Sequence, residues 1–287
     1  MRLRPTGLAA STRPIAGAFA FAFVLTACAS ELPAASSDGS TGATTANGSA
    51  ESDGRESDST GETRADASSE STASTPPPPP TACAEETDIS AAPQNIGEAI
   101  EFINALPHPV TLNCFLERLE RPVPLNATWS TVSLQPADGR RSPRVFLFYG
   151  DLIMSVATDG VPGTTLLEFG EFVAPTKSIK GELAFPIEET LDITAPLQHV
   201  FDGEGSKCRI CHGGEAETPE YDLAFASDAL RFRAMEEVEL DDLKLEHTQC
   251  YATVEPDRCV RLDALFGFGP VVPADFPEGL QTIYDYE

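Results

Sequence analysis

The chain is poor in positive charge. It has 19 Lys and Arg residues against 45 Asp and Glu residues, which gives a formal net charge of −26 at pH 7. Within Cys83–Glu287, 36 acidic residues accompany 14 basic ones. A surface this negative repels the phosphate groups of nucleic acids and of anionic lipids. We therefore expect no nucleic-acid partner, and we expect basic proteins or cations to be favoured.

Common catalytic motifs are also missing from the sequence. It contains no Gly-rich phosphate loop, no G-x-S-x-G elbow, no H-E-x-x-H pair and no calcium-binding loop. Each of these motifs places the groups that its chemistry requires, so their absence leaves hydrolase, kinase and metalloprotease functions without support.

The N-terminus has the pattern of an export signal. Three arginines within the first thirteen residues precede an apolar run, Ile15–Leu25, that is too short to span a bilayer. The run ends in Leu25-Thr26-Ala27-Cys28, which resembles the lipobox of bacterial lipoproteins. The resemblance implies a signal peptide over residues 1–27 and a lipid on Cys28 that attaches the protein to a membrane. The alternative is an ordinary secretory signal in which Cys28 has no such role.

A polar segment follows the lipobox. Residue Ala29 is not aspartate, so the resemblance to sorted lipoproteins implies the outer membrane, facing the periplasm or the cell surface. Residues 28–82 are rich in Ser, Thr, Ala, Gly, Asp and Glu, lack aromatic residues, and contain the proline run Pro76–Pro80. Such a segment cannot bury enough apolar surface to fold. We predict a disordered linker that stiffens into polyproline II near its end.

The first half of the folded part is predicted to be mainly β. Two segments, Asn95–Leu106 and Thr111–Leu119, have apolar residues at helical spacing. Five apolar runs bounded by Gly, Pro and Asp then predict strands at Thr128–Leu134, Arg144–Tyr149, Leu152–Ala157, Thr165–Phe172 and Ser178–Phe185. The link Gly150-Asp151 has the length of a tight hairpin. We expect residues 83–195 to form a mainly antiparallel, sandwich-like unit that begins with helices.

The second half, residues 196–287, has clearer helical patterns. They occur at Leu240–Thr248 and at Arg258–Phe266, and the second is preceded by Pro256-Asp257 and followed by Gly267. A length of roughly 90 residues suits a small cofactor domain. The sequence thus predicts an α+β fold with a β unit followed by a small, mostly helical unit.

One motif carries specific chemistry. Residues Cys208-Arg209-Ile210-Cys211-His212 have the C-x-x-C-H spacing of c-type haem attachment. On a helical turn, residues i and i+3 share a face, so two thiols at this spacing can add to the two vinyl groups along one haem edge. In this motif the chain resembles c-type cytochromes. The resemblance implies that Cys208 and Cys211 hold one covalent haem and that His212 is the proximal iron ligand.

The distal iron ligand is left open. Small cytochromes c supply a methionine next to a proline, whereas this chain has only Met235 after the motif and no proline beside it. His247, on the predicted helix Leu240–Thr248, is the other candidate. Either residue can belong to the core instead, and a five-coordinate iron is the third possibility. Two protein ligands favour electron transfer, whereas an open position permits gas binding or peroxide chemistry.

The remaining cysteines are expected to form disulfides. Free thiols rarely persist in exported proteins. Cys28 for lipid and two cysteines for haem leave four of the seven, and the pairs closest in sequence are Cys83–Cys114 and Cys250–Cys259. The lipidated cysteine therefore explains an odd cysteine count in an exported chain.

The export signal and the C-x-x-C-H motif together indicate a lipid-anchored monohaem protein that transfers electrons at the cell envelope. They favour an electron carrier or binding protein over an enzyme, without deciding between them, and a basic protein as redox partner. The main alternative is a non-catalytic envelope lipoprotein, for binding or assembly, in which Cys208 and Cys211 form a structural disulfide. A thiol oxidoreductase shares C-x-x-C, but no βαβ alternation surrounds the motif. A closed zinc site would need two further ligands.

Overall fold

A computed structural model of the chain describes residues 82–132, 137, 139–159 and 165–285. The predicted signal peptide, Cys28 and residues 28–81 of the predicted linker lie outside the described residues. The described residues belong to one compact unit. Within the described ranges, no helix is both long and apolar enough to cross a membrane.

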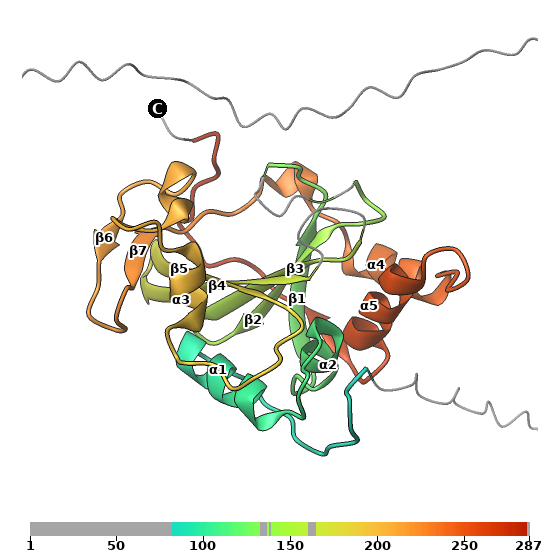
Figure 1. The fold of residues 1–287 in the computed structure, drawn as a ribbon. Coiled ribbons are helices and arrows are strands. Elements are labelled where there is room, and N and C mark those ends of the chain that lie inside the picture. Colours follow the sequence, from blue (N-terminus) through green and yellow to red (C-terminus); the bar gives the residue numbers. More distant parts are fainter. Residues whose placement is uncertain (1–81, 133–136, 138, 160–164, 286–287) are drawn as a thin grey trace, which may run out of the picture. The chain divides into compact units, whose positions relative to one another are not determined.

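The described part contains helices and strands in an α+β arrangement (Figure 1), which confirms the predicted class. The helices are α1 (Ile96–Ala105), α2 (Leu112–Glu117), α3 (Ala195–Val200), α4 (Leu240–Thr248) and α5 (Pro256–Phe266), with 3₁₀ turns η1 (Lys207–Ile210) and η2 (Ala234–Glu236). The strands are β1 (Val123–Thr128), β2 (Arg144–Tyr149), β3 (Leu152–Ala157), β4 (Leu166–Ala174), β5 (Lys177–Ala184), β6 (Ala216–Glu217), β7 (Phe225–Asp228) and β8 (Val271–Pro273).

These strands form one sheet in the order β6-β7-β5-β4-β3-β2-β1-β8. Every pairing is antiparallel except the one between β1 and β8, which is parallel. The prediction of a sandwich-like arrangement was therefore wrong, because the described strands form one sheet. The apolar side of the sheet is covered by helices instead of a second sheet, because Leu147, Met154 and Leu167 share one buried core with Ile100 of α1 and Phe115 of α2.

The two sides of the sheet differ. We call the apolar side the core face, and we call the other side the open face. On strands β2 to β5 the open face carries alternate residues that are mostly only half-buried. Two neighbouring rows of paired residues cross this face from β2 to β5. One row is Phe148, Ile153, Gly170 and Lys180, and the other is Phe146, Ser155, Glu168 and Glu182.

Helix α3 packs closely against β5 on the core face. A Cβ atom built on Gly181 would lie 2.8 Å from Cβ of Pro196 in α3, a distance that real side chains do not adopt. Gly181 is therefore the residue that lets α3 approach the sheet. This helix leads directly into the segment that carries the C-x-x-C-H motif.

The sheet crosses the boundary that the sequence predicted between residues 195 and 196. Strands β6, β7 and β8 all lie after that boundary, yet β7 pairs with β5, β8 pairs with β1, and β6 extends the same sheet by pairing with β7. These strands have between two and four residues. Such lengths are too short to show a period-two pattern, which explains why the sequence suggested only helices there.

Most predicted elements in the first half are present. Strands β2 and β3 have the predicted bounds, and they are joined at Gly150, whose φ of 58° suits glycine in a tight hairpin. The predicted strand Thr128–Leu134 was misplaced in its described part, because β1 ends at Thr128 and residues 129–132 form no strand; residues 133–134 lie outside the described residues. The position of β1 could not be recognised in the sequence because the strand contains Pro124, and proline lacks a backbone donor and argues against a strand.

Both predicted disulfides are confirmed. Cys83 is bonded to Cys114 of α2, and Cys250 is bonded to Cys259 of α5. The first ties the start of the described part to the buried core, since Cys114 is fully buried. The second closes the connection between α4 and α5.

Candidate functional site

The C-x-x-C-H motif folds as a single tight turn. The 3₁₀ turn η1 begins after Ser206, whose side chain accepts a hydrogen bond from the backbone N–H of Cys208. The carbonyl of Cys208 then accepts from the N–H groups of Cys211 and His212, at 3.1 and 2.9 Å. Residues i and i+3 of a 3₁₀ turn eclipse each other, so both cysteines lie on one side of it.

Neighbouring side chains hold this turn in place. Glu215 accepts hydrogen bonds from the backbone N–H of Ser206 at 3.0 Å and from its hydroxyl at 2.5 Å. Arg209, inside the motif, forms an ion pair with Asp202 at 2.8 Å. Contacts of Ser206 and Arg209 with neighbouring carboxylates therefore fix the backbone of the turn that carries the three motif side chains.

His212 is held as a neutral imidazole. Its Nδ1 lies 2.8 Å from the backbone carbonyl oxygen of Asp228 in β7. A carbonyl oxygen can only accept, so Nδ1 carries the hydrogen and Nε2 keeps its lone pair. Burial lowers the pKa of His212 to about 4, which keeps the ring neutral at physiological pH. Iron-ligating and zinc-ligating histidines are oriented in this way, by a second bond from the other ring nitrogen.

The two thiols of the motif are half-buried and take no part in either disulfide. Burial raises the pKa of the Cys208 thiol, although a hydrogen bond with Ser206 and the charge of Lys180 act in the opposite direction. Redox-active C-x-x-C motifs need the reverse, a thiol with a lowered pKa. The environment of Cys208 therefore argues against a thiol oxidoreductase.

These residues fit the requirements of covalent haem attachment. Two thiols lie on one side of a turn, and the adjacent imidazole is neutral, oriented and able to donate the Nε2 lone pair. Among the described residues, no group of three or more His, Cys, Asp or Glu side chains is arranged to hold a metal ion by itself. Haem iron requires only His212 from this motif.

A charged cluster lies beside the motif on the open face. The ammonium group of Lys180 donates to Oγ of Ser178 at 2.6 Å and reaches the Asp228 carbonyl at 3.4 Å. Arg144 forms an ion pair with Glu168 across the sheet. Burial lowers the pKa of Lys180 to about 8 and that of Arg144 to about 10.

The same cations act on the motif. Lys180 and Arg144 both lower the pKa of His212, and the Lys180 charge also acts on Cys208. His212 and Lys180 also share the backbone carbonyl of Asp228, so the motif lies beside β5. Sequence analysis missed this cluster, because strand residues separated by 36 positions carry no shared pattern.

The structure does not bring His247 to the motif. His247 lies in α4, which packs against α5 and β1 at the other end of the sheet from β7 (Figure 1). Its Nε2 lies 2.8 Å from a carboxylate oxygen of Asp263, and its ring stacks on Phe266. These contacts give His247 a structural role in joining α4 to α5.

Met235 is also remote from the motif. It lies in η2, where the carbonyl of the next residue, Glu236, accepts from the N–H of Trp129 directly after β1. Its side chain is 71% exposed. Neither of the two distal candidates that the sequence offered is therefore positioned beside His212.

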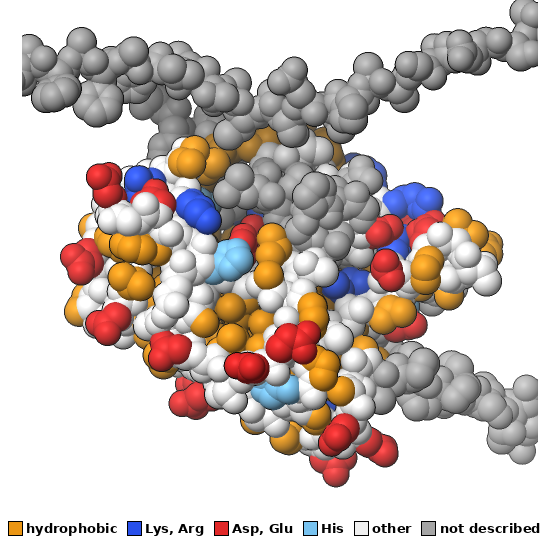
Figure 2. Space-filling view, in the orientation of Figure 1, with side chains coloured by type: hydrophobic (Ala, Val, Ile, Leu, Met, Phe, Trp, Pro, Cys, Tyr) orange, Lys and Arg blue, Asp and Glu red, His pale blue; other side chains and the backbone are white. Residues whose placement is uncertain are grey.

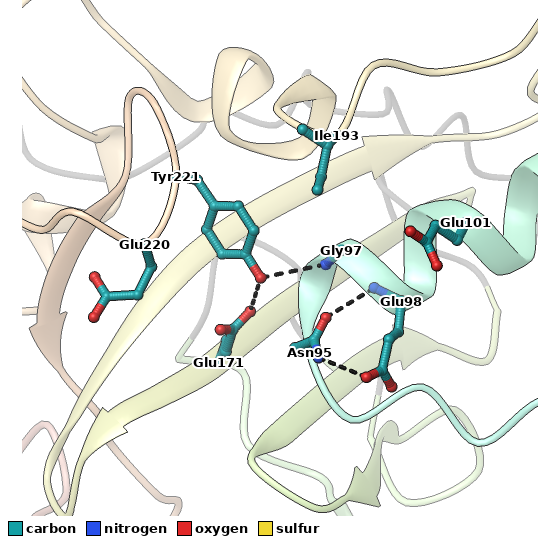
Figure 3. Close-up of a pocket in the computed structure, with 8 residues that line it drawn as sticks. All are labelled: Asn95, Gly97, Glu98, Glu101, Glu171, Ile193, Glu220 and Tyr221. Carbon is teal, nitrogen blue, oxygen red and sulfur yellow. Dashed lines mark hydrogen bonds between the residues drawn. The ribbon is translucent and has the colours of Figure 1, made fainter.

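A pocket at the start of α1 contains a second polar cluster (Figure 3). The hydroxyl of Tyr221 donates to the buried Glu171 of β4 at 2.9 Å, and the same carboxylate accepts from the N–H of Ile96 at 2.8 Å. The carboxylate thus satisfies one of the free N–H groups of the helix N-terminus. Burial and the bond to Glu171 raise the pKa of Tyr221 to about 12. These groups satisfy one another, which indicates that they fix α1 on the sheet.

No protein-family model, curated protein or solved structure matches this chain. Its function therefore has to be inferred from the residues themselves and from their geometry.

Proposed function

We propose that the protein is a lipid-anchored c-type monohaem protein that transfers electrons at the bacterial cell envelope. Cys208 and Cys211 would hold the haem through thioether bonds, and His212 would be its proximal ligand. The observation that carries this proposal is the hydrogen bond from Nδ1 of His212 to the Asp228 carbonyl, beside two thiols of the same turn. When bound, haem supplies one-electron chemistry whose potential is tuned by its protein surroundings.

The residues around the motif have separable tasks in this proposal. The Asp228 carbonyl keeps the proton on Nδ1 of His212, so that the Nε2 lone pair would be available to bind the haem iron. Ser206 and Glu215 hold the turn that presents both thiols. The cations Lys180 and Arg144 stabilise the reduced state, because ferrous haem carries one positive charge fewer than ferric haem.

The distal position is assigned to no residue of the C-terminal region. Met235 is largely exposed, and His247 is bound to Asp263 at the other end of the sheet. These placements support the third possibility, that the iron would be five-coordinate or completed by water or a small ligand.

Attachment to the membrane rests on the sequence Leu25-Thr26-Ala27-Cys28. A lipid on Cys28 would place the folded part at the outer membrane, and the acidic linker would keep it away from the lipid surface. The folded part is itself acidic, and Figure 2 shows Asp and Glu spread over the visible face, with fewer Lys and Arg. A redox partner with a basic surface would be attracted to it.

Haem attachment is tested by expressing the full chain together with a cytochrome c maturation system. We expect a pyridine haemochrome spectrum and a haem mass on the peptide that contains Cys208 and Cys211. The variant Cys208→Ser/Cys211→Ser should carry no haem. A wild-type product without haem, whose peptide mass shows a Cys208–Cys211 disulfide, would support the structural-disulfide alternative and reject the proposal.

The role of His212 is tested in the haem-loaded protein. We expect His212→Asn to change the absorption spectrum and lower the midpoint potential or haem yield, because the proximal ligand is lost. His199→Asn is the matched control, since His199 is half-exposed and paired with Glu182 at 2.9 Å. Equal spectra for His212→Asn and the wild type would exclude His212 as the ligand.

Membrane attachment is tested separately from haem binding. We expect Cys28→Ser to move the protein from the membrane fraction to the soluble fraction without changing its haem spectrum. A wild-type protein that is soluble and lacks an acyl mass would contradict the lipid anchor and leave the haem assignment standing.

A further inference from the structure

We propose that the haem plane lies against the open face of the sheet, over Gly170 and Ile153, so that this sheet face is the haem-binding surface. The inference rests on the proposed haem attachment and goes beyond it, because it identifies the surface that would shield the group from water. It also departs from the sequence-based expectation of a mostly helical haem unit.

A row of four side-chain positions crosses the open face at this point. Phe148 of β2 pairs with Ile153 of β3, Ile153 pairs with Gly170 of β4, and Gly170 pairs with Lys180 of β5. Adjacent strands lie about 4.8 Å apart, so the distance from Ile153 to Lys180 along this row is about 10 Å. That distance is close to the width of a porphyrin ring.

Because Gly170 has no side chain, the backbone is most accessible in the middle of the row. A Cβ atom built on Gly170 would have its nearest described neighbours at 3.7 Å, the carbonyl oxygen of Ile153 and Oγ of Ser178. On the opposite face of the sheet, a Cβ atom on Gly181 would collide with Pro196 of α3 at 2.8 Å. Gly181 is thus covered by a helix, whereas the neighbours of Gly170 within 4 Å, among the residues that the structure describes, belong to strands alone. A flat group can approach the backbone most closely over Gly170.

The row ends at the attachment motif. The Lys180 ammonium and Nδ1 of His212 share one acceptor, the carbonyl oxygen of Asp228, at 3.4 and 2.8 Å. His212 therefore lies at the β5 end of the row, and a group bonded to the motif can extend from there over Gly170.

The far end of the row is apolar. The ring of Phe148 is half-buried and meets the ring of Phe276 edge-on, with centroids 5.1 Å apart. Phe146, one pairing step away, contacts Phe276 and Phe232. Apolar contacts around haem lower solvent access and favour the less charged ferrous state. The open face thus offers an apolar border opposite the motif.

Radical footprinting of the haem-loaded full chain tests this placement. The oxidation rates of Phe148 and Ile153 are compared with those in Cys208→Ser/Cys211→Ser, which cannot hold the haem covalently. Tyr251 and Val254 serve as internal controls, because they are 70% and 74% exposed and lie in the connection between α4 and α5. We expect protection of Phe148 and Ile153 in the haem-loaded chain, and unchanged rates at both controls.

A second variant tests whether the haem lies over Gly170. Gly170→Leu should reduce the protection of Ile153 and alter Soret circular dichroism, because the added side chain occupies the place of the ring. Tyr251→Leu should change neither.

The outcomes separate the two proposals. Covalent haem without protection of Phe148 and Ile153 would overturn the placement and leave the proposed function intact. Absence of covalent haem would reject the proposed function, and the placement with it.

Discussion

The two disulfides should contribute unequally to stability, and the difference can be worked out from their loops. Cys83–Cys114 joins residues 31 apart in sequence, whereas Cys250–Cys259 joins residues 9 apart. In the chain-entropy description, the closed loops restrict the unfolded state by ~3.7 and ~2.6 kcal/mol. Loop length alone thus makes the first bond more stabilising by ~1.1 kcal/mol.

The folded state adds to this difference in the same direction. Cys114 is fully buried in the core, so its replacement by alanine leaves unfilled space. In the other pair Cys259 is also buried, but Cys250 is only half-buried, with Nη1 of Arg258 3.7 Å from its sulfur. We therefore expect Cys83→Ala/Cys114→Ala to lose more free energy of unfolding than Cys250→Ala/Cys259→Ala.

Urea unfolding followed by far-UV circular dichroism measures both losses. Free energies extrapolated to water are compared, since removal of a cross-link also changes the urea dependence through the unfolded state. If the Cys250–Cys259 variant proved as destabilised as the other, or more so, loop entropy and burial would not be the controlling terms.

Three further predictions concern the sheet. Gly181→Ala should lower the free energy of unfolding by about 1–3 kcal/mol, because the new methyl group meets α3. Gly170→Ala should be tolerated, and thermal unfolding of both variants measures the difference. Burial lowers the pKa of Lys180 in the folded state to about 8, below its unfolded value of 10.5. The unfolded chain therefore binds more protons between pH 8 and 10.5, and stability should rise with pH there by about 3 kcal/mol in total. Lys180→Met should remove that rise in urea titrations at several pH values. Tyr221→Phe should cost about 1 kcal/mol by removing the donor to Glu171, and a loss near zero would show that water replaces the bond.

Local patterns predicted the strongly periodic elements. Residues 96–105 form a helix because their apolar side chains and ends follow the expected spacing. Strands β2 and β3 have the predicted bounds because Gly150 fixes their hairpin. Both disulfides followed from cysteine number and spacing. These features depend on residues close together in the chain.

Features that depend on distant residues were not predictable. The parallel pairing of β1 with β8 joins residues about 150 positions apart, and three residues of β8 carry no pattern of their own. In the candidate site, the C-x-x-C-H spacing identified His212, but nothing in the sequence indicated that the carbonyl of residue 228 would orient it. Met235 and His247 were chosen by residue type alone, and tertiary packing places both elsewhere.

The orientation of His212 depends on a backbone carbonyl and not on a side chain, which determines which mutations can disturb it. Any amino acid at position 228 supplies the same carbonyl oxygen, so substitution of Asp228 leaves the acceptor in place. What the imidazole requires is the pairing of Asp228 with Lys177, which sets where that carbonyl points. A slip of β7 by one residue would turn the carbonyl away and remove the acceptor. The orientation of the His212 imidazole is therefore set by a strand register. Point mutation at position 228 leaves it unchanged, whereas insertions or deletions in the β6–β7 hairpin should disturb it.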